Sequence, residues 1–203
     1  MDKESAIVYV VDDDEAVRDS LKLLLESVNL ACQTFASATE FLEKHDPNQH
    51  SCLVADIRMP GMSGLDLHEE LNRRSSTIPV LFITGHGDVP MAVDAMKSGA
   101  LDFIQKPFRD QDLLDRIHQA LESDEARRED NRELSETRSR IARLTARETE
   151  VMHRVVQGQA NKVIALDLGV SQRTVEIHRA RVMQKMGARS LAELVRMVGK
   201  LLD

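Results

Sequence analysis

The sequence of 203 residues contains no apolar run of about 18 residues, the length that a membrane-spanning helix needs. Its first residues, MDKESAIVYVVDDDE, lack the basic start and the small-residue cleavage site of a signal peptide, so their apolar run is typical of a strand. The two cysteines, Cys32 and Cys52, lack the spacing of a metal site, which favours reduced thiols in a core. We therefore expect a cytoplasmic protein that has no membrane partner.

Charge is distributed unevenly along the chain, whose net charge is -7. Residues 1–123 carry 11 Lys and Arg against 22 Asp and Glu, a net charge of -11. Residues 145–203 carry 10 against 6, a net charge of +4. This asymmetry indicates that any contact with nucleic acid belongs to the second part of the chain.

Short apolar runs alternate with amphipathic segments over the first 120 residues. Several runs are apolar at nearly every position, which is typical of parallel strands covered by helices on both faces. The pattern predicts an open, doubly wound (βα)5 domain of the α/β class. The predicted strands are Ala6–Val11, Ala31–Phe35, Cys52–Ala55, Pro79–Ile83 and Leu101–Ile104.

The stretch from Glu122 to Arg140 alternates acidic and basic residues and contains neither Pro nor Gly. It predicts an exposed helix that continues from the fifth helix of the α/β domain, with a partly disordered linker as the alternative. Beyond it, capping residues such as Asn161 and Ser171 and helix-ending glycines predict four helices and no strand. These helices of a small all-α domain span about 146–157, 162–168, 172–186 and 191–201.

Chemically matched residues end four of the five predicted strands. The first strand ends in Asp12-Asp13-Asp14, the third in Asp56, the fourth in Thr84 and the fifth in Lys106. Ligands of an open parallel sheet bind at the carboxyl ends of its strands, near the point where the strand order reverses. An Asp at one strand end is most often a helix cap, but four matched ends predict a common pocket.

The residue types at these strand ends suit aspartyl phosphorylation. Asp56 can attack a phosphoryl group as a carboxylate nucleophile. Crowded carboxylates repel one another, and a hard divalent ion such as Mg²⁺ relieves that repulsion while it binds phosphate oxygens. Lys106 and the Thr84 hydroxyl are suitable partners for the phosphoryl oxygens, and Lys106 can pair with Asp56 beforehand.

Four stretches resemble the signature motifs of receiver domains, most closely those of the FixJ type: VVDDDEAVR, DIRMPGMSGLDL, ITGHGDVPMAV and DFIQKPF. The match covers residues 5–122 without a large gap. The resemblance implies a flavodoxin-like receiver fold in which Asp56 is the phospho-acceptor and Asp12 and Asp13 form an acidic pair.

The same resemblance implies a Mg²⁺ or Mn²⁺ ion in the acidic pocket. Its ligands would be Asp13, Asp56 and the backbone carbonyl of Arg58, with Asp12 acting through water. Asp14 stands where the family commonly has Glu, so it can compete as a metal contact.

The resemblance also implies how a phosphoryl group is sensed. Thr84 and Lys106 match the family's phosphate-sensing hydroxyl and lysine, Phe103 matches its switch aromatic, and the Lys106–Pro107 peptide is expected to be cis. Thr84 moving toward the phosphate would let Phe103 swing inward. The changed face, helix four, strand five and helix five at roughly 88–121, would then form a homodimer. On it Val89, Met91, Val93 and Phe108 are either partly exposed or core, while Arg58 and His86 occupy positions that tune the phosphate lifetime.

Residues 144–203 resemble a LuxR-type helix-turn-helix, with the motifs T-x-R-E, N-K-x-I-A, S-x-R-T-V and K-M-G. The physical pattern agrees, because two helices separated by Gly169 form the unit whose second helix enters the major groove. In that second helix Val175, His178, Val182 and Met186 share a face that we expect in the core.

The opposite face of the second helix is expected to contact DNA. Glu176 can accept from a cytosine amino group, Ile177 can touch thymine methyl groups, and Ala180 lies on the same face. The basic residues suited to phosphates, each otherwise a solvated charge, are Lys162, Arg173, Arg179, Arg181 and Lys185.

Together these observations predict a two-component response regulator with a receiver at 1–122, a charged linker at 123–143 and a DNA-binding domain at 144–203. The resemblance implies a transcriptional activator, not a turnover enzyme, whose partners are a sensor histidine kinase, promoter DNA and RNA polymerase. Two alternatives stay open. One is a phosphatase that uses Asp12 of a D-x-D motif as its nucleophile. The other is a phosphorylation-independent DNA-binding protein with a vestigial receiver.

Overall fold

The structure, a computed structural model, describes residues 6–85 and 89–201. Its contacts divide the chain into two compact units, residues 1–128 and 129–203. Within the described residues, no helix is both long and apolar enough to cross a membrane.

The first unit is built on a five-stranded parallel sheet with the order β2-β1-β3-β4-β5. This is the flavodoxin-like order, which reverses direction at β1 and β3. The predicted α/β fold is confirmed, and each strand limit differs from the predicted one by at most one residue. The strands are Ile7–Val11 (β1), Ala31–Phe35 (β2), Ser51–Asp56 (β3), Val80–Thr84 (β4) and Asp102–Gln105 (β5).

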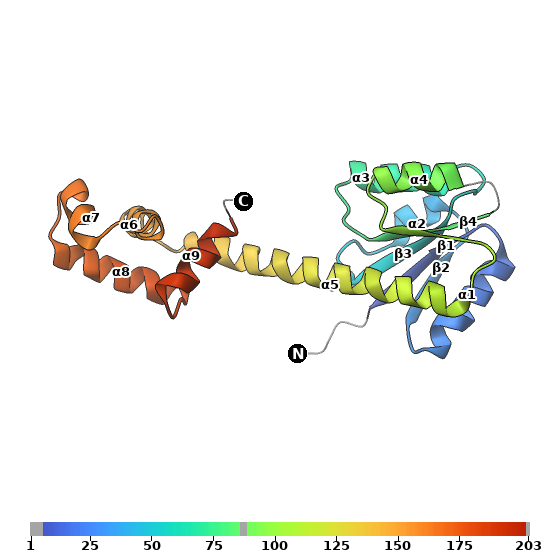
Figure 1. Ribbon diagram of the computed structural model, residues 1–203, viewed down its shortest axis with the longest axis horizontal. Helices are drawn as coiled ribbons and strands as arrows, with labels where there is room; N and C mark the ends of the chain where they lie inside the picture. Colours follow the sequence, from blue (N-terminus) through green and yellow to red (C-terminus); the bar gives the residue numbers. More distant parts are fainter. Residues whose placement is uncertain (1–5, 86–88, 202–203) are drawn as a thin grey trace. The chain divides into compact units, whose positions relative to one another are not determined.

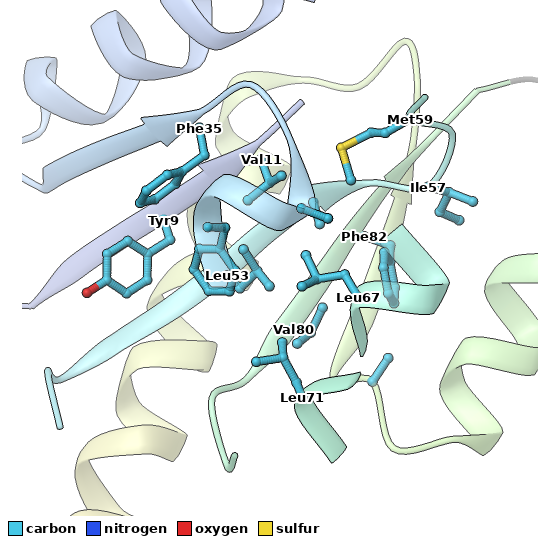
Figure 2. Close-up of a cluster of buried hydrophobic side chains, with 14 of the residues drawn as sticks. Tyr9, Val11, Phe35, Leu53, Ile57, Met59, Leu67, Leu71, Val80 and Phe82 are labelled. Carbon is cyan, nitrogen blue, oxygen red and sulfur yellow. The ribbon is translucent and has the colours of Figure 1, made fainter. Parts of the chain in front are cut away.

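Helices cover both faces of the sheet (Figure 1). Glu15–Ser27 (α1) and the first part of Asp110–Ile141 (α5) pack on one face, against side chains such as Val8 and Val10. On the other face, Tyr9, Phe35, Phe41 and Phe82 lie in a second buried cluster, much of which Figure 2 shows. The helices on that face are Ala38–Lys44 (α2), Gly64–Arg73 (α3) and Val89–Lys97 (α4).

Helix α5 continues through the charged stretch as far as Ile141, so this stretch is helical, while its role as a linker between two domains stays a prediction. The sequence pattern gave no sign that Asp124, inside this stretch, is fully buried. Its carboxylate accepts from the Ser51 amide at 3.1 Å and from Arg128 Nε at 2.6 Å. Arg128 also donates to the carbonyls of Asn48 and Gln49, each at 2.6 Å. It therefore provides hydrogen-bond donors for the backbone of the loop that precedes β3.

After α5 ends, the described residues of the second unit form four helices joined by short turns, with no strand. Its core contains residues such as Val151, Ile164, Val175, Met186 and Leu194. Asn161 is the first residue of its helix, where we expected the N-cap; Ala160 takes the cap position and makes no side-chain hydrogen bond. The helices are Ala146–Val156 (α6), Asn161–Leu168 (α7), Gln172–Met186 (α8) and Leu191–Gly199 (α9).

Candidate functional sites

Three of the predicted strand-end residues meet at the carboxyl edge of the sheet. Lys106 follows β5, and its Nζ lies 2.9 Å from Asp56 Oδ1 at the end of β3. The same ammonium lies 3.4 Å from Asp12 Oδ2, directly after β1. Asp12 is 3 % exposed as a residue and the Asp56 side chain is 13 % exposed. Two carboxylates therefore share one lysine in a largely desolvated pocket, which we call the acidic pocket (Asp12, Asp56 and Lys106).

Local hydrogen bonds fix the loop that follows β1. Asp12 Oδ1 accepts from the Asp14 amide at 2.9 Å, and Asp14 in turn caps α1 by accepting from the Ala16 amide. Arg18 Nη1 donates to the carbonyls of Asp12 and Asp13 at 2.8 and 3.0 Å. Asp14 thus acts as a helix cap, and Arg18 is a positioning residue of the loop that sequence reasoning left without a role.

The Asp56 carboxylate is held by a backbone amide just beyond the end of β3. Its Oδ2 accepts from the Arg58 amide at 2.7 Å, so both carboxylate oxygens have a donor. Residue 64 must be a glycine here, because an added Cβ would lie 2.2 Å from the Asp56 carbonyl oxygen. Gly64 therefore allows α3 to begin directly against the end of β3.

The electrostatics of the acidic pocket are unbalanced. Burial raises the pKa of Asp12, and the charge of Asp56 adds to that effect, against the hydrogen bond from Asp14 and the charge of Lys106. Burial alone would lower the pKa of Lys106, but its hydrogen bond to Asp56 and the charges of both acids raise it. One lysine thus does not fully compensate two desolvated carboxylates.

The predicted metal ligands are brought together only in part. Among the described residues, no three acidic, His or Cys side chains gather closely enough to form a metal cluster. Asp12 and Asp56 share Lys106, whereas the neighbouring Asp13 is exposed. The donor set still suits a hard divalent cation, because it consists of carboxylate oxygens whose mutual repulsion such a cation would relieve.

The side chains of Thr84 and Phe103 take no part in the ion pairs of the acidic pocket, although the Lys106 amide donates to the Thr84 carbonyl at 2.8 Å. Thr84 is fully buried, and its hydroxyl donates to the Gly85 carbonyl at 3.1 Å. Phe103 is half-buried against the cluster of Figure 2. The Lys106–Pro107 peptide is cis, as the family resemblance implies.

The face predicted to form a dimer carries exposed apolar side chains. Val93 and Met96 of α4 are 42 % and 37 % exposed, whereas Met91 and Phe108 are partly buried. His86 and the side chain of Val89 lie outside the described residues. Both side chains are exposed and apolar, and the dimer predicted for this face stays a prediction.

Helices α7 and α8 form the expected helix-turn-helix. Gly169 ends α7 in the left-handed conformation, at φ 64°, and the Ser171 side chain caps α8 by accepting from the Thr174 amide. The predicted core residues of α8, Val175, Val182 and Met186, are buried. His178 of the same face is half-buried.

The exposed side of α8 carries Glu176, Ile177 and Ala180. Of the basic residues predicted to contact phosphates, three are exposed: Lys162, Arg173 and Arg181. The other two make internal contacts in this structure. Arg179 Nη1 donates to Asn161 Oδ1 at 2.7 Å, which ties α8 to α7, and Lys185 belongs to an ion pair. Their contacts with DNA stay a prediction.

The ion pair joins the last turn of α8 to the first turn of α6. Lys185 Nζ lies 2.6 Å from Oε2 of Glu148, which is 2 % exposed. Glu148 also forms a capping box with Thr145. The hydrogen bond from Lys185, followed by that from the Thr145 amide, lowers the pKa of Glu148 to about 2. Sequence reasoning did not identify Lys185 as the partner of Glu148.

Comparisons with known proteins identify the family of each domain. Residues 8–118 match the response regulator receiver domain, and residues 142–198 match the luxR family of bacterial regulatory proteins. Nodulation protein W of Bradyrhizobium diazoefficiens is 52 % identical over 192 residues, which cover 95 % of this chain and 85 % of that protein. The transcriptional regulatory protein FixJ of Azorhizobium caulinodans is 52 % identical over 196 residues, or 96 % of this chain and 92 % of that one.

A solved structure is also similar over nearly the whole chain. The response regulator StyR is 47 % identical, with a TM-score of 0.87, and the match covers 97 % of this chain and 99 % of that one. The motifs of the sequence also resemble StyR in particular, and the chain is a relative of that protein. The resemblance to FixJ-type receivers and LuxR-type helix-turn-helix domains is confirmed.

Proposed function

The chain belongs to the response regulators that join a receiver domain to a LuxR-family DNA-binding domain, and we propose that phosphorylation of Asp56 switches its dimerisation and its DNA binding. Members of this family regulate transcription and are not turnover enzymes. Their two domains imply a kinase and DNA as partners. For this chain, we propose a sensor histidine kinase, promoter DNA and RNA polymerase, in the cytoplasm. The sharing of Lys106 by Asp12 and Asp56 is the observation that supports the proposal most directly.

The phosphoryl transfer follows from the contacts of Asp56. A carboxylate oxygen attacks the phosphorus of the kinase phosphohistidine, the P–N bond breaks, and the leaving nitrogen takes the electron pair and a proton. Lys106, already 2.9 Å from the carboxylate, is placed to neutralise a phosphoryl oxygen. Asp13, Asp56 and the Arg58 carbonyl would hold Mg²⁺ or Mn²⁺, with Asp12 acting through water. When bound, the ion supplies positive charge for the acids and the phosphoryl oxygens.

The switch would begin at Thr84. Its hydroxyl, which donates to Gly85 in this structure, would turn to donate to a phosphoryl oxygen. The vacated space would admit Phe103, whose ring is only half-buried here. Phe103 lies on β5, and α4 packs against β4 and β5. The exposed face of α4, β5 and α5 would therefore change and form the homodimer.

Mapping the acyl phosphate tests the receiver. We expect labelling with phosphoramidate and Mg²⁺ to place the phosphoryl group on Asp56, and we expect no label in the D56N variant. Label on Asp12 would favour the phosphatase instead. Unchanged dimerisation and DNA binding in D56N under phosphorylating conditions would favour the vestigial receiver.

The DNA face has a separate test. We expect R173A to weaken binding to all duplexes and to reduce the slope of log affinity against log salt by about 1, because a phosphate contact releases counterions. We expect E176A to change base preference at one position, since its carboxylate accepts from a base edge. Equal losses on all sequences for E176A would contradict its assigned role.

A further inference from the structure

The C-terminal end of α8 receives a side chain from α5. Arg140 Nη1 donates to the Met186 carbonyl at 2.7 Å. Met186 is the last residue of α8, and carbonyls in the last turn of a helix have no partner within the helix. A cation at this end also interacts favourably with the helix dipole. Arg140 therefore caps α8 from a different helix.

The guanidinium of Arg140 is held in place on both sides. Its Nη2 donates to Glu136 Oε1 at 2.6 Å, one turn earlier on α5. On the other side, Gly187 has a φ of 66°, and an added Cβ would lie 3.0 Å from Arg140 Nη1. The glycine thus ends α8 and also leaves room for the arginine.

A second contact supports the same attachment. Lys185 Nζ donates to the Arg143 carbonyl at 3.3 Å as well as to Glu148. The last turn of α8 is therefore bonded to the end of α5 and to the turn that leads into α6. The residues proposed to read bases lie toward the other end of α8, where Glu176 is ten positions from Met186.

We propose that Arg140 is a positioning residue for DNA recognition, which sets the orientation of α8 without touching DNA. This inference rests on the proposed DNA binding of α8. Ten residues of helix span about 15 Å, so a tilt of about 10° at the capped end would move the base-reading side chains by about 2–3 Å. Hydrogen bonds to base edges do not survive such a shift, whereas flexible contacts to phosphates do. Loss of Arg140 therefore affects sequence discrimination more than general affinity.

The experiment uses the full chain and two duplexes. One is selected by the wild-type protein from a random-sequence pool, and the other has the same composition in scrambled order. We expect R140A to bind the selected duplex about 10-fold more weakly, because one base contact is worth about a factor of ten. We expect its affinity for the scrambled duplex and its salt slope to be unchanged. R138A, which removes an exposed arginine from the same helix, is the matched control. It should retain the wild-type ratio of the affinity for the selected duplex to that for the scrambled duplex.

Other outcomes overturn the proposal in distinguishable ways. Equal weakening on both duplexes with a shallower salt slope would make Arg140 a phosphate contact. An unchanged ratio in folded R140A would leave only an internal contact that recognition does not use. Where R140A does not fold, R140K is measured in its place. Because lysine lacks the planar guanidinium, R140K should lower the ratio of selected to scrambled affinity by about 3-fold. A wild-type protein that selects no duplex would contradict the proposed function itself.

Discussion

The two units each contain a buried carboxylate paired with a lysine, and the two sites are used differently. In the acidic pocket, Asp12 and Asp56 compete for Lys106 at the open edge of the sheet. In the DNA-binding unit, the Glu148 carboxylate pairs with Lys185 and also accepts from the Thr145 amide. The pKa of Asp12 is raised, whereas that of Glu148 is lowered to about 2. The two sites thus share their chemistry but differ in charge balance.

The difference separates a site that can accept a ligand from one that stabilises the fold. Asp12 and Asp56 leave excess negative charge in a largely buried place, which favours a divalent cation; the cation would in turn offset the charge of a transferred phosphoryl group. Glu148 is fully compensated, so a further charge would gain nothing there. An unbalanced buried acid indicates function more reliably than burial or ion pairing alone.

Breaking the balanced pair should have the largest effect on stability. K185M leaves the Glu148 carboxylate buried without its cation, so we expect the melting temperature of the DNA-binding unit to fall by about 5–10 °C. Adding E148Q to K185M removes the uncompensated charge and should restore part of the lost melting temperature. Circular dichroism and calorimetry of the full chain measure the melting temperatures, with K162M at an exposed position as the control. A melting temperature equal to that of K162M would show that the pair is not structural.

Removing a charge from the acidic pocket should instead raise the melting temperature. We expect D12N to raise the melting temperature of the receiver by about 2–5 °C without divalent ions, because it relieves an uncompensated carboxylate. The same variant should weaken Mg²⁺ binding by roughly 10–100-fold, the usual cost of losing a residue that supports a metal site.

Titrating Mg²⁺ while following the melting temperature measures both effects on D12N, since a ligand of the folded state stabilises it by mass action. D19N, which neutralises an exposed acid on α1, is the control. A D12N variant that is less stable than the wild type without Mg²⁺ would make the acidic pocket a structural pair like that of Glu148.

The acidic pocket could be predicted from the sequence because its position follows from topology. Parallel strands end at one edge of a sheet, so Asp12, Asp56 and Lys106 needed only the correct strand order to meet. Thr84 also lies at that edge, but its rotamer depends on packing, and its hydroxyl donates to Gly85. Metal geometry likewise depends on side-chain directions that the spacing of residues does not define.

The contacts of Asp124, Arg140 and Lys185 could not be predicted from the sequence. Arg140 and Glu136 have the spacing of an ordinary ion pair on a helix surface, and nothing nearby in the sequence indicates that Arg140 also reaches Met186. Hydrophobic periodicity shows which face of a helix is apolar, but not where a long charged side chain ends. For the same reason, Asp124 looked like one more solvated acid in a charged stretch, although it is fully buried.

The smallest expected effect is a pair of opposite pH dependences. The lowered pKa of Glu148 means that the unfolded chain binds more protons between about pH 2 and its ordinary value of 4.5, so its contribution to stability rises with pH there. That contribution is fully present above pH 4.5 and is lost as the pH falls toward 2. Asp12 has the opposite effect on stability, because its raised pKa lets the folded state keep a proton up to a higher pH than the unfolded chain. Stability falls as the pH rises from 3.8, the ordinary pKa of Asp12, through its raised value.

Melting curves of E148Q and D12N at steps between pH 3 and pH 7, each taken as a difference from the wild type, isolate the two contributions. We expect E148Q to lose more relative to the wild type as the pH rises from 3 to about 5, because the wild type gains the compensated carboxylate over that range. We expect D12N to gain relative to the wild type over the range that begins near pH 3.8. Differences with the same sign in both variants would mean that the two sites have the same charge balance, and the distinction between an unbalanced site for a ligand and a balanced pair for the fold would fail.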